Sequence, residues 1–458
     1  MRRFGAIIIG AGQAGPPLAG RLTSAGMTVA LVERKLFGGT CVNTGCMPTK
    51  TLVASAYAAQ LARRGSEYGV VLGDAIRVDM GRVKARADTV SANARASVER
   101  SLRGMQGCTV FTEHARFEAA DTVRVGEDRL TAPRIFINVG GRAVVPDMPG
   151  IGDVSYLTNS SILQLDQLPE HLVVVGGSYV GLEFAQMYRR FGAEVTVVEK
   201  GAHLVAREDE EVSEAIRDIL IREGITVRTG AECISFARHE RGVAVAVDCT
   251  DGEPSIPGSH VLLAVGRRPN TEDLGLDSAG VVTDARGYII VDDGLATNVA
   301  GIWALGDCNG RGAFTHTAYN DFEIVAANLL AGERRRVSDR IPAYALYIDP
   351  PLGRVGMTES QARASGRPLL IGRRPMSRVG RAIEKGETQG FMKVIADAET
   401  QKILGAAILG TGGDEAIHGV LDMMHADVVY DVLVRAVPIH PTVSELIPTM
   451  LSEMKPAG

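Results

Sequence analysis

The run Ala6-Ile7-Ile8-Ile9-Gly10-Ala11-Gly12-Gln13-Ala14-Gly15 decides the fold of this chain. Four successive apolar residues are typical of a parallel strand that is buried on both faces. The three glycines follow at once with GxGxxG spacing, and helical spacing continues from Leu18 to Ala25. Thr28 to Val32 is the next expected strand, and it ends at Glu33. The succession of strand, glycine turn, helix and strand predicts a βαβ unit of the dinucleotide-binding type.

Each position of this turn has a physical role in holding a dinucleotide. Gly10 permits the tight turn, Gly12 lets a pyrophosphate approach the helix N-terminus, and Gly15 lets the helix lie against the strand. Ala14 is part of the same turn. Glu33 is placed to accept a hydrogen bond from an adenosine ribose hydroxyl. We therefore expect these five residues to contact a dinucleotide.

A second unit of the same design begins near residue 171. An apolar strand over 172–175 leads into Gly176-Gly177-Ser178-Tyr179-Val180-Gly181, and a helix is expected from Leu182 to Phe191. Ser178 replaces the middle glycine but is small enough for close phosphate approach. The strand over 195–198 ends at Glu199. Two such units predict two dinucleotides, one held permanently and one exchanged.

The residue at the end of the second unit bears on the choice of nicotinamide cofactor. Glu199 favours an unphosphorylated ribose, and hence NADH over NADPH. His203 and Arg207 follow closely, and a basic group there could receive a 2′-phosphate. NADPH therefore stays possible.

Two cysteines separated by four residues follow the first unit, in Gly38-Gly39-Thr40-Cys41-Val42-Asn43-Thr44-Gly45-Cys46-Met47-Pro48-Thr49-Lys50. A disulfide that closes so short a loop constrains the unfolded chain little, so we expect it to be redox-active rather than structural. Cys46 lies at an expected helix start with Pro48 just inside it, where the helix dipole lowers a thiol pKa. A two-electron sulfur centre beside a nucleotide cofactor indicates oxidation–reduction chemistry.

Length and composition exclude several other classes of protein. The 458 residues are too many for one core and suggest about three domains. The formal net charge of -5 argues against a nucleic-acid binder. No apolar run approaches the ~20 residues of a membrane span, and the start passes directly into a strand without room for a signal peptide. We expect a cytoplasmic protein whose other cysteines are small buried hydrophobic residues: Cys108, Cys233, Cys249 and Cys308.

Four motifs in this order resemble the class I flavin pyridine nucleotide–disulfide oxidoreductases, which include dihydrolipoamide dehydrogenase, glutathione reductase and mercuric reductase. GGTCVNTGCMPTK is similar to the redox disulfide signature, and GGSYVGLEF is similar to the NAD(P)H-binding turn. The stretch 297–307, which ends Gly306-Asp307, is similar to the second FAD motif, and His440-Pro441-Thr442-Val443-Ser444-Glu445 is similar to the C-terminal acid–base motif. The resemblance covers nearly the whole chain. It implies FAD and NAD(P)H as cofactors and a homodimer as the assembly.

The resemblance also implies roles for individual residues. Cys41 would exchange with substrate, whereas Cys46 would be the thiolate nearer the flavin. Lys50 would contact the flavin near N5 and pair with Glu183. Tyr179 would cover the flavin until nicotinamide displaces it, and Asp307 would hold the ribityl chain. Further cofactor-binding positions are expected at Gly39, Thr40, Ala115, Gly140, Gly176, Gly177, Ser178, Val180, Gly181, Glu199, Gly266 and Gly306.

His440 and Glu445 would complete the site from the partner subunit. Pro441 constrains the backbone after His440, and Glu445 can orient the imidazole by accepting its other N–H. In the family this histidine shuttles the proton for Cys41, which implies that each active site is assembled from two chains. The resemblance also implies a cis His440–Pro441 bond.

The expected fold is therefore α/β, with two Rossmann-like domains, for FAD and NAD(P)H, and a C-terminal α+β dimerisation domain. The FAD domain is expected over 1–148 and 271–335, the NAD(P)H domain over 149–270, and the dimerisation domain over 341–458. Helices are expected near Thr51–Arg64 and Val78–Met105, and a charged linker from Gly332 to Arg340.

Departures from individual family members bear on the substrate. The C-terminal tail carries no vicinal cysteine pair, which mercuric reductase uses to receive metal, and no metal-binding residues are predicted. The run Pro350-Pro351-Leu352-Gly353-Arg354-Val355-Gly356 looks closest to mercuric-reductase-like flavoproteins of the reactive-chlorine-resistance type. We expect an NAD(P)H oxidoreductase that delivers electrons to a metal ion or a small oxidant. The alternatives are a dihydrolipoamide dehydrogenase or another disulfide reductase, and a flavin redox sensor that does not turn over.

Overall fold

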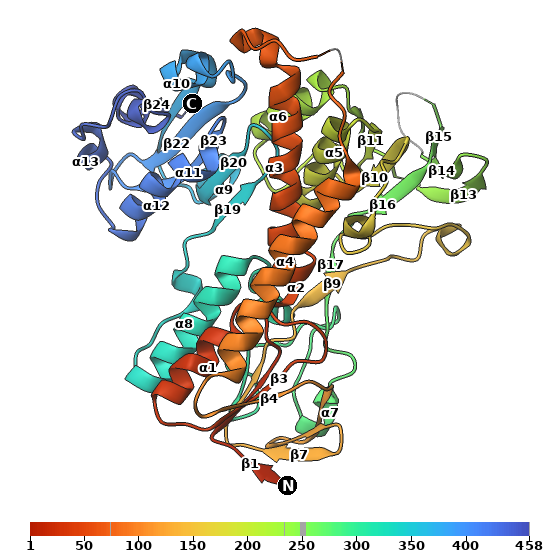
Figure 1. Ribbon diagram of the computed structural model, residues 1–458. Helices are drawn as coiled ribbons and strands as arrows, with labels where there is room; N and C mark the ends of the chain where they lie inside the picture. The colour runs from red at the N-terminus through yellow and green to blue at the C-terminus, as the bar shows by residue number, and fades with distance from the viewer. Residues whose placement is uncertain (74, 233, 248–252, 458) are drawn as a thin grey trace.

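The computed structural model describes residues 1–73, 75–232, 234–247 and 253–457. Figure 1 shows two α/β parts that are connected through long helices, and a third part that contains the C-terminus. Cys233 and Cys249 lie outside the described residues. In the described part, Cys308 is buried, as predicted, but Cys108 is only half-buried because it lies in an edge strand. No helix of the described part is long and apolar enough to cross a membrane.

The first part is built on a five-stranded parallel sheet. Its order is β18 (Ile302–Ala304), β8 (Ile135–Ile137), β2 (Ala6–Ile9), β3 (Val29–Val32) and β4 (Cys108–Phe111). The helices associated with it are α1 (Gly15–Ser24), α4 (Met80–Arg103), α7 (Leu276–Ala279) and α8 (Thr315–Ala331). A smaller sheet has the order β1 (Arg2–Arg3), β7 (Asp128–Thr131), β6 (Thr122–Val125) and β5 (Ala115–Ala119).

The strand β2 explains how this sheet lies between two cores. Successive side chains of a strand point to opposite faces, and all four residues of β2 are buried. Ala6 and Ile8 pack with residues of α1 and α8, while Ile7 and Ile9 pack with residues of the smaller sheet. The continuous apolar run is therefore required by two layers of packing.

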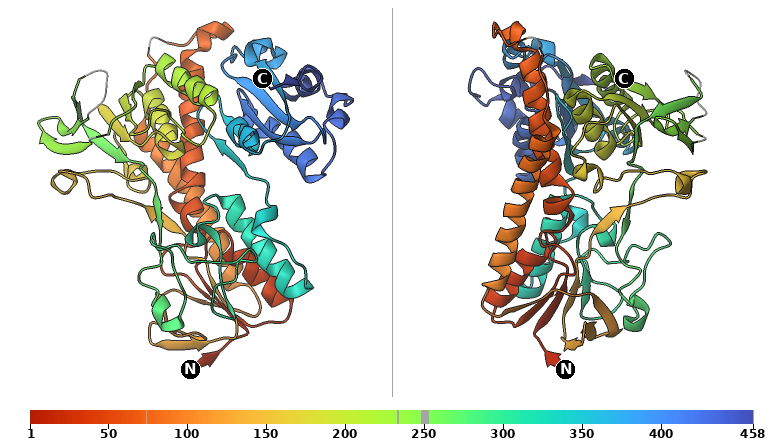
Figure 2. Two further views of the ribbon diagram at one scale, coloured as in Figure 1. Left: turned by 180° about the vertical axis from the view of Figure 1, so that it is seen from behind. Right: turned by 45° about the vertical axis from the view of Figure 1, so that its right-hand side comes forward.

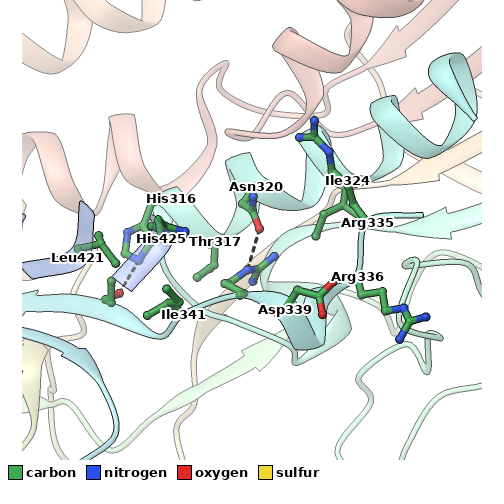
Figure 3. Close-up of a pocket in the computed structure, with 12 residues that line it drawn as sticks. His316, Thr317, Asn320, Ile324, Arg335, Arg336, Asp339, Ile341, Leu421 and His425 are labelled. Atoms are coloured by element: carbon green, nitrogen blue, oxygen red, sulfur yellow. Dashed lines mark hydrogen bonds between the residues drawn. The ribbon is translucent and has the colours of Figure 1, made fainter. Parts of the chain in front are cut away.

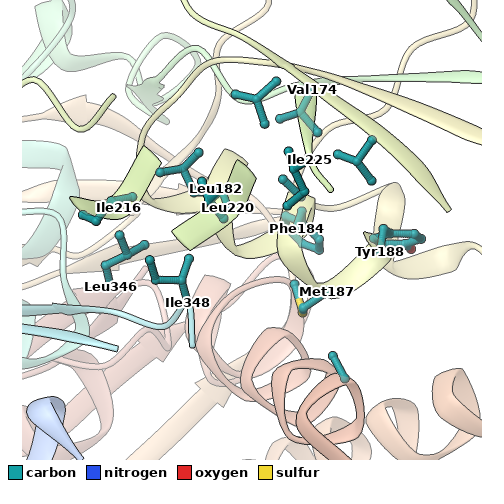
Figure 4. Packing of buried hydrophobic residues seen from close by; sticks show 14 of the residues in the cluster. Val174, Leu182, Phe184, Met187, Tyr188, Ile216, Leu220, Ile225, Leu346 and Ile348 are labelled. Carbon is teal, nitrogen blue, oxygen red and sulfur yellow. The ribbon is translucent and has the colours of Figure 1, made fainter. Parts of the chain in front are cut away.

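The second part repeats this arrangement. Its parallel sheet has the order β12 (Thr226–Arg228), β11 (Glu194–Val198), β10 (His171–Val175) and β16 (His260–Leu263). The antiparallel strands β13 (Ser235–His239), β14 (Gly242–Ala246) and β15 (Ser255–Gly258) share a core with one face, and α5 (Tyr179–Phe191) and α6 (Glu210–Arg222) share a core with the other. Figure 4 shows Val174 of β10 near Leu182 and Phe184 of α5 in this second core. Helix α5 begins three residues before the predicted Leu182, because the turn residues themselves form its first turn.

The C-terminal part is a mixed α+β structure. Its six-stranded sheet has the order β19 (Ala343–Leu346), β20 (Leu352–Gly356), β23 (Ile403–Leu409), β22 (Phe391–Asp397), β21 (Leu369–Pro375) and β24 (Lys455–Pro456). Its helices are α9 (Glu359–Ala364), α10 (Gly380–Glu384), α11 (Gly413–Ala416), α12 (His418–His425), α13 (Asp431–Val434) and α14 (Ile447–Ser452). The predicted fold class is confirmed: two Rossmann-like units and a C-terminal α+β domain.

Two connections bring the two Rossmann-like parts together. The helix α3 (Cys46–Arg63) follows the short α2 (Gly39–Asn43) and packs against both α4 and α5. The antiparallel ribbon of β9 (Gly141–Ala143) and β17 (Arg267–Pro269) links the two Rossmann-like units. The views in Figure 2 show α3 and α4 running side by side along the length of the molecule. The predicted helices near 51–64 and 78–105 correspond to α3 and α4, and α3 begins five residues earlier, at Cys46 itself.

Candidate active site

A cavity of about 1540 Å³ contains both the first glycine turn and the cysteine pair. Fifteen of the predicted site residues line it: Gly10, Gly12, Glu33, Gly39, Thr40, Cys41, Cys46, Lys50, Ala115, Gly140, Tyr179, Val180, Glu183, Gly306 and Asp307. The cavity is larger than the pockets of about 300–1,000 Å³ that hold drug-sized ligands. It therefore has room for a dinucleotide that extends from the glycine turn to the sulfur atoms.

The backbone of the glycine turn fits a bound pyrophosphate. Gly10 has φ +109°, and a Cβ there would lie 2.2 Å from the Asn138 carbonyl oxygen. Gly39 has φ +63°, and its Cβ would lie 2.9 Å from Cα of Gly12. For Gly12 the nearest atom to an added Cβ is Nδ2 of Asn138, at 3.3 Å. The close approach of neighbouring backbone thus requires glycine at positions 10 and 39. Gly10, Gly12 and Gly39 also line the cavity, where a phosphate group can approach the backbone of the turn.

A glutamate closes each of the two Rossmann-like turns in the same way. Oε2 of Glu33 accepts a hydrogen bond from the Ala11 N–H at 3.0 Å, and its Oε1 accepts one from the Lys35 N–H at 2.8 Å. In the second unit, Glu199 accepts from the Gly177 N–H at 2.6 Å and from the Gly201 N–H at 2.7 Å. Each carboxylate oxygen has a second lone pair with which it can accept a ribose hydroxyl.

The two cysteines lie close enough for their side chains to hydrogen-bond, and their acidities differ strongly. Cys41 lies in α2, and Cys46 is the first residue of α3. The hydrogen bond from Cys41 lowers the pKa of Cys46 to about 6; burial opposes this shift, and Thr315 and Lys50 assist it. The Sγ of Cys46 lies 3.2 Å from Oγ1 of Thr315. The pKa of Cys41 is raised by the hydrogen bond to Cys46 and by burial. In the dithiol form, therefore, Cys46 carries the thiolate.

Lys50 lies one helical turn beyond Cys46 and connects all three parts of the fold. Its Nζ donates to Oε2 of Glu183 at 2.6 Å, which is the pairing that the sequence predicts. Glu183 is buried in α5, and its Oε1 accepts from the Tyr347 N–H at 3.0 Å. The Lys50 ammonium also lies 4.6 Å from the centroid of the Tyr347 ring. The ammonium group is thereby held on the wall of the cavity beside the sulfur pair.

Asp307 follows β18 and is held at the cavity wall by Arg267. Nη2 of Arg267 donates to Oδ2 of Asp307 at 3.3 Å and to the Gly141 carbonyl oxygen at 2.5 Å. Burial raises the pKa of Asp307, and the Arg267 guanidinium opposes that shift. This carboxyl group lines the cavity, where it can accept a hydrogen bond from a polyol chain.

Aromatic side chains from all three parts meet at the cavity near Tyr179. The Tyr179 ring makes edge contacts with Phe314 at 6.4 Å and with Tyr344 at 5.6 Å between centroids. Phe314 and Tyr344 are stacked nearly parallel, with an interplanar angle of 11°. Tyr179 and Phe314 both line the cavity.

Other predicted residues lie away from the walls of this cavity. Those of the first turn are Ala14 and Gly15, and a Cβ on Gly15 would lie 2.3 Å from the Gly10 carbonyl oxygen, so Gly15 serves the packing of helix against strand. The remaining ones are Gly176, Gly177, Ser178, Gly181, Glu199, Gly266, His440 and Glu445. Most of these belong to the second unit, whose ligand is expected to reach the cavity only with its nicotinamide end.

His440 and Glu445 form a hydrogen-bonded pair on the surface of this chain. Nδ1 of His440 lies 2.9 Å from Oε2 of Glu445, and the His440 side chain is 81% exposed. The preceding residues Val437 and Ile439 are also exposed, at 96% and 79%. The His440–Pro441 bond is cis, as predicted. Within the described residues, the pair is separate from the cavity that holds the chain's own cysteines.

Sequence reasoning missed several residues of the site. Thr315, Tyr344 and Tyr347 contact predicted residues but stand outside every motif, and Asn138 backs the first glycine turn. Among the missed residues, Arg354 is the one that the sequence could have revealed, because it is a charged residue inside the otherwise apolar strand β20. Among the described residues, no group of three or more His, Cys, Asp or Glu side chains could hold a metal ion.

A second, smaller cavity of about 330 Å³ adjoins the site through His316, which lines both cavities. It lies between α8, the charged linker and α12, as Figure 3 shows. Nε of Arg340 donates to Oδ1 of Asn320 at 2.9 Å, and His316 Nε2 lies 2.7 Å from the Ala343 carbonyl oxygen. The linker is thus tied to α8 next to the active site.

Comparison with known proteins agrees with this geometry. Residues 4–321 match the family described as pyridine nucleotide-disulphide oxidoreductase, and residues 342–451 match the dimerisation domain of the same family. The chain belongs to this family. It is an NAD(P)H-dependent flavoprotein disulfide oxidoreductase, as the motifs predict.

Curated relatives carry several names within the family. The probable pyridine nucleotide-disulfide oxidoreductase RclA of Escherichia coli (strain K12) is 35% identical over 99% of this chain and 100% of its own length. The mercuric reductase of Streptomyces lividans is 32% identical over 96% of this chain and 94% of its own. The dihydrolipoyl dehydrogenase of Thermus scotoductus is 31% identical over 97% and 96%.

A solved structure is similar over almost its entire length. It is described as the Cu(II) complex of the HOCl-induced flavoprotein disulfide reductase RclA from Escherichia coli. The TM-score is 0.90 at 34% identity, and the match covers 99% of each chain.

Proposed function

We propose that this oxidoreductase delivers electrons from NAD(P)H to a metal ion or a small oxidant through Cys41 and Cys46. The observation that carries the proposal is the position of Cys46: its thiol has a pKa lowered to about 6, and it lies beside Cys41 in the cavity that reaches the first glycine turn. A dithiol with one stabilised thiolate is suited to attack a soft metal ion or an electrophilic oxidant.

The residues that would hold FAD are those that line the cavity from the glycine turn to Asp307. Bound FAD would supply the chemistry that links hydride transfer from NAD(P)H to two-electron reduction of the disulfide. The backbone of Gly12 would receive the pyrophosphate, Glu33 the adenosine ribose and Asp307 the ribityl chain. Lys50, held by Glu183, would keep a positive charge beside the Cys46 thiolate.

The electron count agrees with either type of acceptor. When the Cys41 thiol and the Cys46 thiolate close to a disulfide, they release two electrons and one proton. Those electrons can reduce one molecule of a two-electron oxidant, or two Cu(II) ions to Cu(I). That the similar RclA structure is described as a Cu(II) complex supports a metal ion as acceptor.

We propose further that the protein works as a homodimer whose sites are shared. The match to a dimerisation domain and the exposure of His440 next to Val437 and Ile439 support this assembly. His440 of one chain would move the proton for Cys41 of the other, with Glu445 holding its Nδ1. The predicted domain boundaries, FAD over 1–148 and 271–335, NAD(P)H over 149–270 and dimerisation over 341–458, are part of this proposal.

NADH is the proposed reductant. The Glu199 carboxylate is fixed at the end of β11 by the N–H groups of Gly177 and Gly201. A carboxylate held there accepts ribose hydroxyls and repels a 2′-phosphate. His203 is paired loosely with Glu210, at 3.8 Å, so this basic group is not directed solely at the ribose.

A panel of acceptors with NADH and NADPH tests the proposal. We expect steady NADH consumption with Cu(II), abolished in Cys46→Ser and retained in Cys108→Ser, a half-buried cysteine of β4. Rapid reduction of NAD⁺ by dihydrolipoamide without turnover on metal ions would instead establish the dihydrolipoyl dehydrogenase alternative, which relatives such as the Thermus enzyme make the second candidate. Flavin reduction without any turnover would establish the redox sensor.

A further inference from the structure

Glu208 and Arg354 form an ion pair whose two side chains are both 0% exposed. Nε and Nη2 of Arg354 donate to the same oxygen, Oε2 of Glu208, at 3.0 and 2.5 Å. Glu208 lies just before α6 in the second Rossmann-like unit, whereas Arg354 lies in β20 of the C-terminal domain. Since the desolvation of two charges cancels most of their attraction, such a pair is a poor source of stability. Another role must be sought in what the pair contacts.

The other oxygen of Glu208 holds two phenols. Oε1 accepts a hydrogen bond from the Tyr344 hydroxyl at 2.8 Å and one from the Tyr179 hydroxyl at 3.3 Å. Tyr344 and Arg354 are directly opposite each other in the β19–β20 pair. The Glu208 carboxylate therefore accepts hydrogen bonds from both members of one cross-strand pair. The Arg354 guanidinium is paired with this carboxylate, and hydrogen bonds to a carboxylate are stronger than those to a neutral acceptor.

We propose that Glu208 and Arg354 are positioning residues that hold Tyr179 across the nicotinamide side of the active-site cavity. This inference rests on the proposed function and on the role that the sequence resemblance implies for Tyr179, which is to cover the flavin until nicotinamide displaces it. The long bond from Tyr179 competes with the short bond from Tyr344 for one oxygen. Tyr179 is therefore held by the weaker of two bonds, which breaks when the ring moves while Tyr344 stays in place.

The surroundings of the pair are closely packed, so we expect the movement to be confined to the Tyr179 ring. Leu346 and Ile348, beyond Tyr344, are buried against α5 and α6, as Figure 4 shows with Leu182 and Ile216. Asp209, next to Glu208, accepts from the N–H groups of Glu359 and Ser360 at 2.9 and 3.0 Å. The C-terminal domain thus fixes the carboxylate from both sides.

Removing the hydroxyl of Tyr179 and removing the hydroxyl of Tyr344 are expected to change the affinity for NAD⁺ in opposite directions. Nicotinamide has to break the Tyr179–Glu208 bond, so Tyr179→Phe is expected to tighten NAD⁺ binding on the order of fivefold. Tyr344→Phe removes the competing donor and leaves Oε1 to Tyr179, so NAD⁺ binding is expected to weaken about twofold to threefold. Calorimetry on the FAD-loaded dimer measures both. ADP-ribose is the matched ligand, because it lacks nicotinamide and its affinity is expected to stay unchanged in both variants.

A double variant tests the ion pair itself. Glu208→Leu with Arg354→Met replaces two buried charges by apolar side chains of similar size, a change that proteins often tolerate. It is expected to tighten NAD⁺ binding as Tyr179→Phe does. The matched control is Lys393→Met with Glu359→Gln, an ion pair near the same interface that does not contact Tyr179 and whose side chains are 2% and 21% exposed.

The outcomes separate the inference from the proposed function. If Tyr179→Phe shifts the ratio of NAD⁺ to ADP-ribose affinity but a folded double variant does not, the ion pair is not a positioning device. If Tyr179→Phe leaves that ratio unchanged, the bond to Glu208 does not restrain the Tyr179 ring and the inference fails, whereas the proposed function is still decided by the panel of acceptors. If the double variant does not fold, the two single variants decide. Changes in NAD⁺ affinity of opposite sign in Tyr179→Phe and Tyr344→Phe support the inference, and changes of the same sign overturn it.

Discussion

Lys50 and Glu183 lie 133 positions apart in sequence and meet at 2.6 Å on the wall of the cavity that holds both redox cysteines. Lys50 belongs to the helix that begins at Cys46, and Glu183 belongs to the helix of the second glycine turn. The pair therefore fixes the position of the sulfur centre relative to the second Rossmann-like unit, which is expected to bind the nicotinamide cofactor. The sequence predicts that these two residues pair, and the structure places them in contact.

The first prediction concerns the charge of Lys50. Lys50→Met removes a cation that helps to lower the pKa of Cys46, so the pKa of that thiol is expected to rise by roughly one unit. The measurement is the pH at which reduced enzyme becomes reactive toward iodoacetamide. Lys84→Met, which breaks only a helix-surface pair with Asp88, is the control and is expected to change nothing. An unchanged pH dependence in Lys50→Met would contradict the electrostatic role.

The second prediction concerns the pH dependence of the wild-type dithiol. Because the pKa of Cys46 is lowered to about 6, its thiolate is lost only as the pH falls through about 6. Alkylation of reduced enzyme is therefore expected to be slow below that pH and to reach a plateau near neutrality, whereas an ordinary thiol titrates near pH 8.5. In Cys46→Ser the step near pH 6 is expected to vanish. A single step near 8.5 in the wild type would refute the assignment.

The third prediction isolates the hydroxyl of Thr315. Thr315→Val removes the 3.2 Å contact with Cys46 while keeping the shape of the side chain. Since Thr315 helps to lower the pKa of Cys46, turnover is expected to fall severalfold at pH 6 and little at pH 8. Steady-state rates at the two pH values measure this. Thr89→Val, on the exposed surface of α4, serves as the control, and an equal loss at both pH values would indicate a structural defect instead.

Local patterns were sufficient to predict the two Rossmann-like units, because strand, glycine turn and helix follow one another within about thirty residues. Glu33 and Glu199 were found for the same reason, since each ends the strand after its own turn. Thr315, by contrast, meets Cys46 only through the packing of α8 on the first sheet. The spacing of residues along the sequence does not indicate this contact between Thr315 and Cys46.

The Glu208 network shows the same limit more sharply. Its four side chains come from four separate segments. Tyr179 was predicted as the ring that covers the flavin, but its bond to Glu208 was not. Arg354 is fully buried in β20 because Glu208 compensates its charge, and the partner can be identified only once the two domains are docked. The starts of α3 and α5 were placed late, because turn residues such as Cys46 and Tyr179 also form the first helical turn.

The fourth prediction concerns the nicotinamide cofactor. Glu199→Gln keeps the acceptor for the Gly177 N–H but removes the negative charge beside the expected ribose site. The kcat/KM for NADPH is expected to rise about tenfold relative to that for NADH, because a phosphate is no longer repelled. Initial rates with both cofactors give this ratio. Glu194→Gln, an exposed residue at the start of the same strand, is the control, and an unchanged ratio in Glu199→Gln would place the specificity elsewhere.

The fifth prediction tests whether each active site is shared between two chains. Cys41→Ser and His440→Ala are each expected to be inactive as pure dimers. In a mixed dimer, one site would combine the intact cysteines of one chain with the intact histidine of the other, and the second site would lack both. Random mixing makes half of the dimers mixed, so co-expression is expected to restore about one quarter of the wild-type activity. Differently tagged chains allow the mixed dimer to be purified, and it should then show about half of the wild-type rate. A mixed dimer with no more activity than its inactive parents would mean that His440 serves the cysteines of its own chain, whereas full activity of pure His440→Ala would remove the histidine from the reaction.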